Sequence, residues 1–145
     1  MKQAISLPQA LTTARRYQYL EQFQTAEQIY RQILQTAPNV IEALNGLGDV
    51  LIDQGQLEEA ETYCRQALTL DPDFVDGYKN LGDALKLQGH FEQAQICYQR
   101  ALTLEPHNDA LKIKLATILP VIADSSTMLL QCRQQFEENV NRLLS

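Results

Sequence analysis

The fold is decided by residues 44–51, LNGLGDVL, which recur at 78–85 as YKNLGDAL. The same spacing separates Pro38 from Pro72 and Pro72 from Pro106, and we call it the repeat interval. A fixed interval of this length, kept by several residue types at once, is typical of stacked supersecondary units.

Within each unit the apolar residues recur with the period of an α-helix. Leu44, Leu47 and Leu51 lie at i, i+3 and i+7, which places them on one stripe of a helix. A second stripe begins at Leu57 and continues through Ala60. Each unit therefore predicts two amphipathic helices whose apolar faces need a neighbouring unit to cover them.

Glycines and prolines mark the expected helix ends. Gly55 and Gly89 stand where a first helix ends in a left-handed residue, and Pro72 and Pro106 end the second helices. The first unit carries Glu21 in place of the loop glycine.

Short polar pairs precede two of the expected helices. Asn39 with Glu42, and Asp73 with Asp76, have the spacing of a capping box.

Small residues predict where paired helices approach each other. We expect Gly48 to pack against Ala60, and Gly82 against Ala94. A bulky side chain there would cost about 1–3 kcal/mol in overpacking.

These two units resemble the tetratricopeptide repeat (TPR). The resemblance rests on Leu44, Leu47, Gly48, Leu51, Ala60, Ala67 and Pro72, and on Tyr78, Leu81, Gly82, Leu85, Ala94, Tyr98, Ala101 and Pro106. It implies an all-α, right-handed superhelical solenoid of antiparallel helix pairs, with a C-terminal capping helix and one further amphipathic helix. The expected array covers residues 1–120, with units at about 7–40, 41–74 and 75–108, a capping helix at 109–119 and the amphipathic helix at 121–145.

The C-terminal segment carries a second resemblance. Residues 119–122, LPVI, followed by Arg133, Phe136 and Leu143, are similar to the segment after the TPR array in SPINDLY-like, O-linked N-acetylglucosamine-transferase-related bacterial proteins. This implies the N-terminal recognition part of a larger glycosyltransferase, or a relative that lost the enzyme. No catalytic residue is carried over, because these 145 residues do not contain the catalytic region.

Charge and composition exclude several classes of partner. Twelve basic and eighteen acidic residues give a net charge of −6, which argues against nucleic acid and against an anionic membrane surface. No apolar run is long enough to span a bilayer, and residues 1–6 lack the apolar segment of a signal peptide. The three cysteines form no Cys-x-x-Cys pair, so we expect a cytoplasmic protein.

The reactive residue types do not form a catalytic pattern. His90 and His107 fall in expected turns, and Cys64, Cys97 and Cys132 lie on separate helices without the spacing of metal ligands. Cys64 and Cys97 lie on or beside apolar stripes, where cysteine is usually a small buried hydrophobe. We expect no catalytic residue, no metal, no cofactor and no enzyme activity in this chain.

A partner is expected in the concave groove, which the first helix of each unit lines. The candidate partner-binding residues are those on the first helices that packing does not use: Arg15, Tyr19, Glu42, Asn45, Asp49, Ile52, Asp53, Asp76, Lys79, Asn80, Asp83, Lys86 and Leu87. Acidic residues outnumber basic ones in this set. The hypothesis is therefore an extended protein segment or peptide with basic and apolar side chains.

Departures from the family's known grooves refine this hypothesis. Chaperone-binding TPR domains hold a terminal carboxylate with Lys, Asn and Arg side chains, whereas the matching positions here are Leu11, Arg15, Gly46, Asp76 and Asn80. The nearby carboxylates would repel such a ligand.

The glycosyltransferase relatives line the groove with an asparagine ladder that grips peptide backbone. At the equivalent positions of the three units this chain has Thr12, Gly46 and Asn80, so only the third unit keeps the asparagine.

Two functions from different classes remain, with one further possibility. The favoured function is a non-catalytic protein–protein interaction scaffold, and the alternative is the substrate-recognition part of a SPINDLY-like glycosyltransferase. Self-association, through the groove or through an uncapped end of the array, is the third possibility.

Overall fold

The protein is described by a computed structural model that covers residues 4–118 and the helix at 126–144, with side chains given to residue 118 and from residue 133. These residues form helices and no strand. The helices are α1 (Leu7–Tyr19), α2 (Phe23–Thr36), α3 (Ile41–Asp53), α4 (Leu57–Leu70), α5 (Val75–Leu87), α6 (Phe91–Leu104), α7 (Asp109–Ile118) and α8 (Ser126–Leu144). The LPVI stretch, the expected end of the capping helix and the side chain of Cys132 lie outside the described residues.

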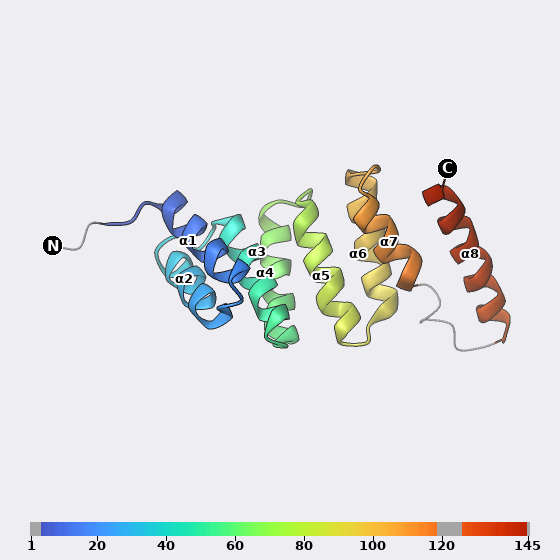
Figure 1. Ribbon diagram of the computed structural model, residues 1–145, viewed down its shortest axis with the longest axis horizontal. Coiled ribbons are helices and arrows are strands. Elements are labelled where there is room, and N and C mark those ends of the chain that lie inside the picture. The colour runs from blue at the N-terminus through green and yellow to red at the C-terminus, as the bar shows by residue number, and fades with distance from the viewer. Residues whose placement is uncertain (1–3, 119–125, 145) are drawn as a thin grey trace.

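The helices form one row in which each packs against the next (Figure 1). The helices α1 and α8 lie at opposite ends of this row. In addition, α1 contacts α3 and α3 contacts α5. The first helices of successive pairs thus form a continuous inner wall, which confirms the all-α solenoid of helix pairs.

The turns between paired helices have the predicted backbone. Gly55 and Gly89 have φ angles of 78° and 86°, directly after the C-caps of α3 and α5. Glu21 occupies the same position in the first pair with a φ of 60°. The first pair therefore makes the same turn, with a side chain that disfavours this conformation.

The predicted capping boxes of α3 and α5 are wrong. The N-cap residues are Val40 and Phe74, and neither end has a side-chain cap. Asn39 and Asp73 lie one residue too early because each helix begins one residue later than expected. A capping box does form at α1, between Ser6 and Gln9.

Close helix packing occurs at the predicted glycines, partly with other neighbours. A Cβ at Gly48 would lie 2.8 Å from Cys64 Sγ and 3.5 Å from the carbonyl oxygen of Ala60. At Gly82 it would lie 2.6 Å from the ring of Tyr98, a neighbour that the sequence did not indicate. A large ring, rather than a small residue, fills the space that Gly82 leaves.

Two cysteines belong to the core. Cys64 and Cys97 are buried and unpaired with each other. Burial raises the pKa of Cys64 to about 12 and that of Cys97 to about 11. Both thiols stay protonated at neutral pH, which confirms their role as small hydrophobes.

Candidate functional site

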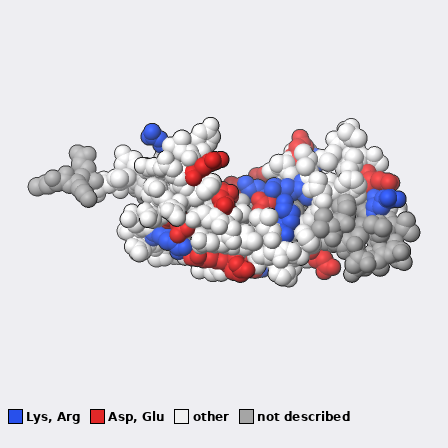
Figure 2. Space-filling model, turned by 60° about the horizontal axis from the view of Figure 1, so that its bottom comes forward, with Lys and Arg blue, Asp and Glu red and all other residues white. Residues whose placement is uncertain are grey.

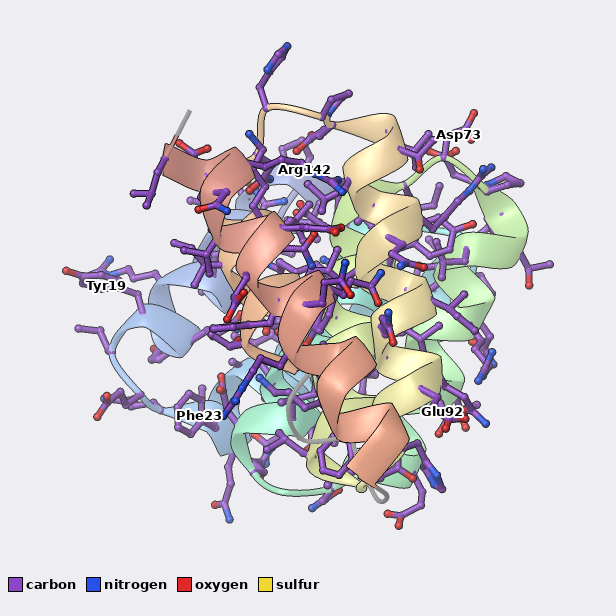
Figure 3. All side chains as sticks on the ribbon, turned by 90° about the vertical axis from the view of Figure 1, so that its right-hand side faces the viewer. Tyr19, Phe23, Asp73, Glu92 and Arg142 are labelled. Atoms are coloured by element: carbon purple, nitrogen blue, oxygen red, sulfur yellow. The ribbon has the colours of Figure 1, made fainter. Side chains whose placement is uncertain are left out.

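The candidate residues lie on α1, α3 and α5, the helices of the inner wall, and differ in exposure. Arg15, Tyr19, Glu42, Asp53, Asp76 and Leu87 are exposed; Asn45, Asp49, Ile52, Lys79, Asp83 and Lys86 are half-buried; Asn80 is buried. Acidic and basic side chains gather side by side midway along the array (Figure 2). Seen along the array, Tyr19 projects on the side opposite to Asp73 and Glu92 (Figure 3).

Asp49 is held by neutral partners. Its carboxylate accepts a hydrogen bond of 2.5 Å from Gln18 Nε2, and Gln18 Oε1 accepts one of 3.3 Å from the hydroxyl of Tyr30. Burial raises the pKa of Asp49, and the nearby charges of Asp83 and Asp76 act in the same direction. The hydrogen bond from Gln18 and the positive charge of Lys79 oppose this rise in the pKa.

Asp49 belongs to an acidic patch that also contains Asp53 and Asp76. Burial raises the pKa of Asp53, and the charge of Asp49 adds to the rise. In the part of the chain that the structure describes, none of the ion pairs involves a residue of the acidic patch. The patch therefore presents carboxylates whose charge is uncompensated by direct contact.

Asp83, one repeat further along, is held by charged and polar partners. Asp83 Oδ1 accepts hydrogen bonds from the Tyr98 hydroxyl at 2.5 Å and from Lys114 Nζ at 2.8 Å. The ammonium of Lys114 also lies 5.8 Å from the centre of the Tyr98 ring. Sequence reasoning missed Lys114, although it stands one repeat interval after Asn80 and so continues the inner row.

An amide pair links the second and third units. Asn80 Nδ2 donates to Asn45 Oδ1 at 2.9 Å, across α3 and α5. Asn80 is only 2% exposed, and its Oδ1 has no hydrogen-bond partner among the described residues. Asn80 is therefore a buried residue, and its amide orients that of the half-buried Asn45.

The described residues offer little for metal or catalytic chemistry. His90 and His107 are exposed, as expected. Over residues 4–118 and 126–144, no group of three or more His, Cys, Asp or Glu side chains is arranged to hold a metal ion. None of the helices in this part of the chain is long and apolar enough to cross a membrane.

The fold defines a class: an α-helical solenoid whose α1, α3 and α5 carry charged and polar side chains. The family follows from residues 39–105, which match the tetratricopeptide repeat model. Residues 39–105 are therefore tetratricopeptide repeats, as the resemblance in the sequence implied. No sequence among the curated proteins matches it.

Solved structures with this fold come from proteins of different kinds. The first TPR domain of Spaghetti (RPAP3), bound to the HSP90 peptide SRMEEVD, is 21% identical, with a TM-score of 0.76 over 79% of this chain and 91% of that one. MamA of Desulfovibrio magneticus RS-1 is 19% identical, with a TM-score of 0.76 over 93% of this chain and 76% of that one.

The O-GlcNAc transferase of Thermobaculum terrenum is 30% identical over 76% of this chain, with a TM-score of 0.74. The chain spans 21% of that structure, so the similarity concerns a minor part of the transferase.

Proposed function

We propose that the chain is a cytoplasmic, non-catalytic protein–protein interaction scaffold. Its concave groove binds an extended peptide segment with basic and apolar side chains. The observation that carries this proposal is the acidic patch on the inner wall, whose carboxylates contact no cation within the described residues. A lysine or arginine of a ligand would supply the missing charge, and the interaction would strengthen as the groove loses water.

The remaining groove residues complement such a ligand. Exposed Tyr19 and Leu87, with half-buried Ile52, offer apolar surface along the inner wall. Because Asn45 Oδ1 is used by Asn80, its Nδ2 remains as a donor for a peptide carbonyl. The amide of Asn45 therefore offers a donor next to Gly46, the position at which the glycosyltransferase relatives carry an asparagine.

The peptide-bound relative indicates what this groove disfavours. Three of the last four residues of the peptide SRMEEVD in the RPAP3 complex are acidic. The carboxylates of Asp49, Asp53 and Asp76 would repel such a sequence, so we propose a ligand of the opposite charge.

The test is a titration of a fluorescent basic–apolar peptide library into the protein. We expect binding in the micromolar range, because an extended peptide loses conformational entropy in a shallow groove. Asp49→Lys should weaken binding at least about tenfold. Glu92→Lys is the matched control: it makes the same change in net charge on the opposite side of the array and should change affinity less than about twofold. Equal effects of both variants, or no binding peptide, would refute the proposal.

A second candidate function is favoured by the similarity to the Thermobaculum O-GlcNAc transferase. In this alternative, the chain is the substrate-recognition part of a SPINDLY-like glycosyltransferase whose catalytic domain lies outside these residues. An antibody against the array distinguishes the two functions in an extract of the native cells. A band near 16.5 kDa supports the free scaffold, whereas a much larger band supports the enzyme.

A further inference from the structure

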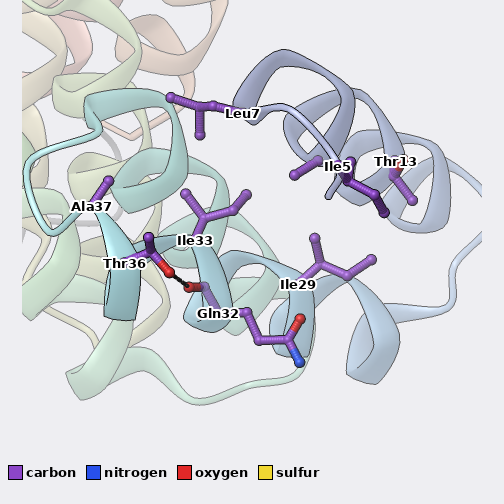
Figure 4. A pocket seen from close by; sticks show the side chains of 9 residues that line it. Ile5, Leu7, Thr13, Ile29, Gln32, Ile33, Thr36 and Ala37 are labelled. Carbon is purple, nitrogen blue, oxygen red and sulfur yellow. Dashed lines mark hydrogen bonds between the residues drawn. The ribbon is translucent and has the colours of Figure 1, made fainter. Parts of the chain in front are cut away.

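A second surface lies at the N-terminal end of the array, away from the acidic patch. An open groove of about 350 Å³ runs between α1 and α2 (Figure 4). We call this lining, which is mostly apolar, the head face; it includes Ile5, Leu7, Ala10, Thr13, Ile29 and Ile33. Ile5 is 68% exposed, so this surface presents large apolar side chains to solvent.

The head face is the first copy of a surface that is buried in the next unit. One repeat interval after Ala10 and Thr13 stand Leu44 and Leu47, which are 2% and 0% exposed. The residue at the same interval after Ile33 is Ala67, and both of these are buried, so the difference in exposure concerns the α1 side of the face. The same face of the repeat is therefore covered inside the array and uncovered at its head.

Inside the array, the second helix of the preceding unit provides this cover. Leu34 of α2 lies in one cleft with Leu47 and Tyr63 of the second unit. Leu68 of α4, which matches Leu34 in the next unit, is the closest neighbour of Gly77 in the third unit, with its Cδ2 2.9 Å from a Cβ placed there. A leucine at this position is thus the covering residue at successive unit boundaries.

The last helix continues this register. One repeat interval onward from Leu68 stands Leu102 of α6, and the next interval leads to Phe136 of α8. Phe136 lines a shallow groove of about 260 Å³ on α8 together with Val140. Leu144, two turns further, is 81% exposed. Among the described residues, α8 packs against α7.

We propose that the head face of one molecule receives α8 of a second copy of this chain. The contact continues the unit-to-unit packing of the solenoid across two molecules. Charge repulsion between the two ends does not oppose this contact. The N-terminal end, residues 1–40, holds four basic and two acidic residues, and the C-terminal end, residues 109–145, holds four of each. The acidic residues in excess lie in the second and third units, between the two ends.

This contact joins two different surfaces, so it does not close on itself. Each dimer keeps one free head face and one free α8, and further copies add to an open chain. The proposal is independent of the groove ligand, because it uses no residue of the acidic patch.

Sedimentation equilibrium of the whole chain, from about 10 μM to about 1 mM, tests the contact. The average mass should rise continuously with concentration, beyond twice the 16.5 kDa of one chain. A mass of one chain at all concentrations would overturn the proposal, and it is also the result expected if a different protein or a further repeat covers the head. A mass that stops at two chains would overturn it as well, because it indicates a closed contact.

Variants at each end sharpen the test. The head variant Ile5→Glu with Thr13→Glu, and the tail variant Phe136→Glu, should each be monomeric with unchanged helical circular dichroism. An equimolar mixture of the two keeps one intact head and one intact tail, and should form heterodimers and nothing larger. Ile96→Glu, an exposed change on α6, should assemble like the unaltered chain. If Phe136→Glu reduces helicity, Leu144→Glu replaces it. Monomers in the mixture, or assembly of either end variant alone, would overturn the proposal.

Discussion

Asp49 and Asp83 occupy the same position in the second and third units, yet their surroundings differ. Asp83 binds the hydroxyl of Tyr98 and the ammonium of Lys114. The positions one repeat interval before these two partners hold Cys64 and Asn80.

Neither Cys64 nor Asn80 donates a hydrogen bond to Asp49 or neutralises its charge. The Cys64 thiol is buried against Gly48, and Asn80 bonds to Asn45 and carries no charge. One repeat position thus serves as a structural anchor in one unit and as an open carboxylate in the other. The difference follows from two positions: Cys64 occurs where the third unit has Tyr98, and Asn80 occurs where the following unit has Lys114.

The largest effect is expected from removing the cation of the third unit. Lys114→Met should lower the free energy of unfolding by about 2 kcal/mol, because it leaves the half-buried Asp83 without its counter-charge. Lys112→Met is the control: Lys112 pairs with the exposed Asp109 at 3.7 Å and should cost less than about 0.5 kcal/mol. Urea denaturation measures both, and equal costs would show that Asp83 does not depend on Lys114.

The next effect concerns the glycines that precede these aspartates. Gly82→Ala should lower the free energy of unfolding by about 1–2 kcal/mol, because the added methyl meets the rigid ring of Tyr98. Gly48→Ala should cost about half as much, since it meets the single sulfur atom of Cys64. Thermal denaturation followed by circular dichroism compares them, and the reverse order would contradict the packing described for the two units.

A smaller effect, of opposite sign, is expected at the turn of the first unit. Glu21→Gly should raise the free energy of unfolding by about 0.5–1 kcal/mol, because glycine adopts a positive φ without strain. Gly55→Ala, at the same turn of the second unit, should lower it by about 1 kcal/mol. Urea denaturation measures both variants. If Glu21→Gly is less stable, the Glu21 side chain stabilises the fold by more than the strain of its positive φ costs.

The smallest effect is that of Asp49 on the pH dependence of stability. Because the folded protein raises the pKa of Asp49 above 3.8, it binds a proton more tightly than the unfolded chain. Stability from this group is therefore gained as the pH falls through the raised pKa and is complete below 3.8. Asp49→Asn should remove this dependence and raise stability at pH 7 by less than about 1 kcal/mol. Denaturation curves at pH 4 to 7 decide this, and a destabilised Asp49→Asn at neutral pH would contradict it.

The periodic features of this fold were predictable, whereas its side-chain partners were less so. Gly55 and Gly89 predicted the turns because a positive φ depends on the local backbone, and the same register located the turn at Glu21. The contact of Tyr98 with Gly82 was not predicted, because helical periodicity gives the face of a residue but not the reach of a long side chain. The capping boxes failed because helix ends shift by one residue more easily than helix interiors.

Within the candidate site, the sequence identified the inner wall and its excess of carboxylates. It did not show which carboxylates are neutralised, because that depends on Lys114, a residue of α7 that lies outside the two clear repeats. Extending the repeat register by one more unit would have placed Lys114 beside the groove. The burial of Asn80 depends on the close contact of α3 with α5, which a single sequence does not give.

The most direct test of the account compares isosteric neutralisation at the two equivalent aspartates. Asp49→Asn and Asp83→Asn remove the same charge from the same repeat position, and isothermal titration with a basic–apolar peptide that binds the unaltered chain measures the consequence. The account predicts that Asp49→Asn weakens the peptide about tenfold, whereas Asp83→Asn changes its affinity less than about twofold and lowers stability instead. A loss of affinity at Asp83→Asn that equals or exceeds that at Asp49→Asn would contradict it.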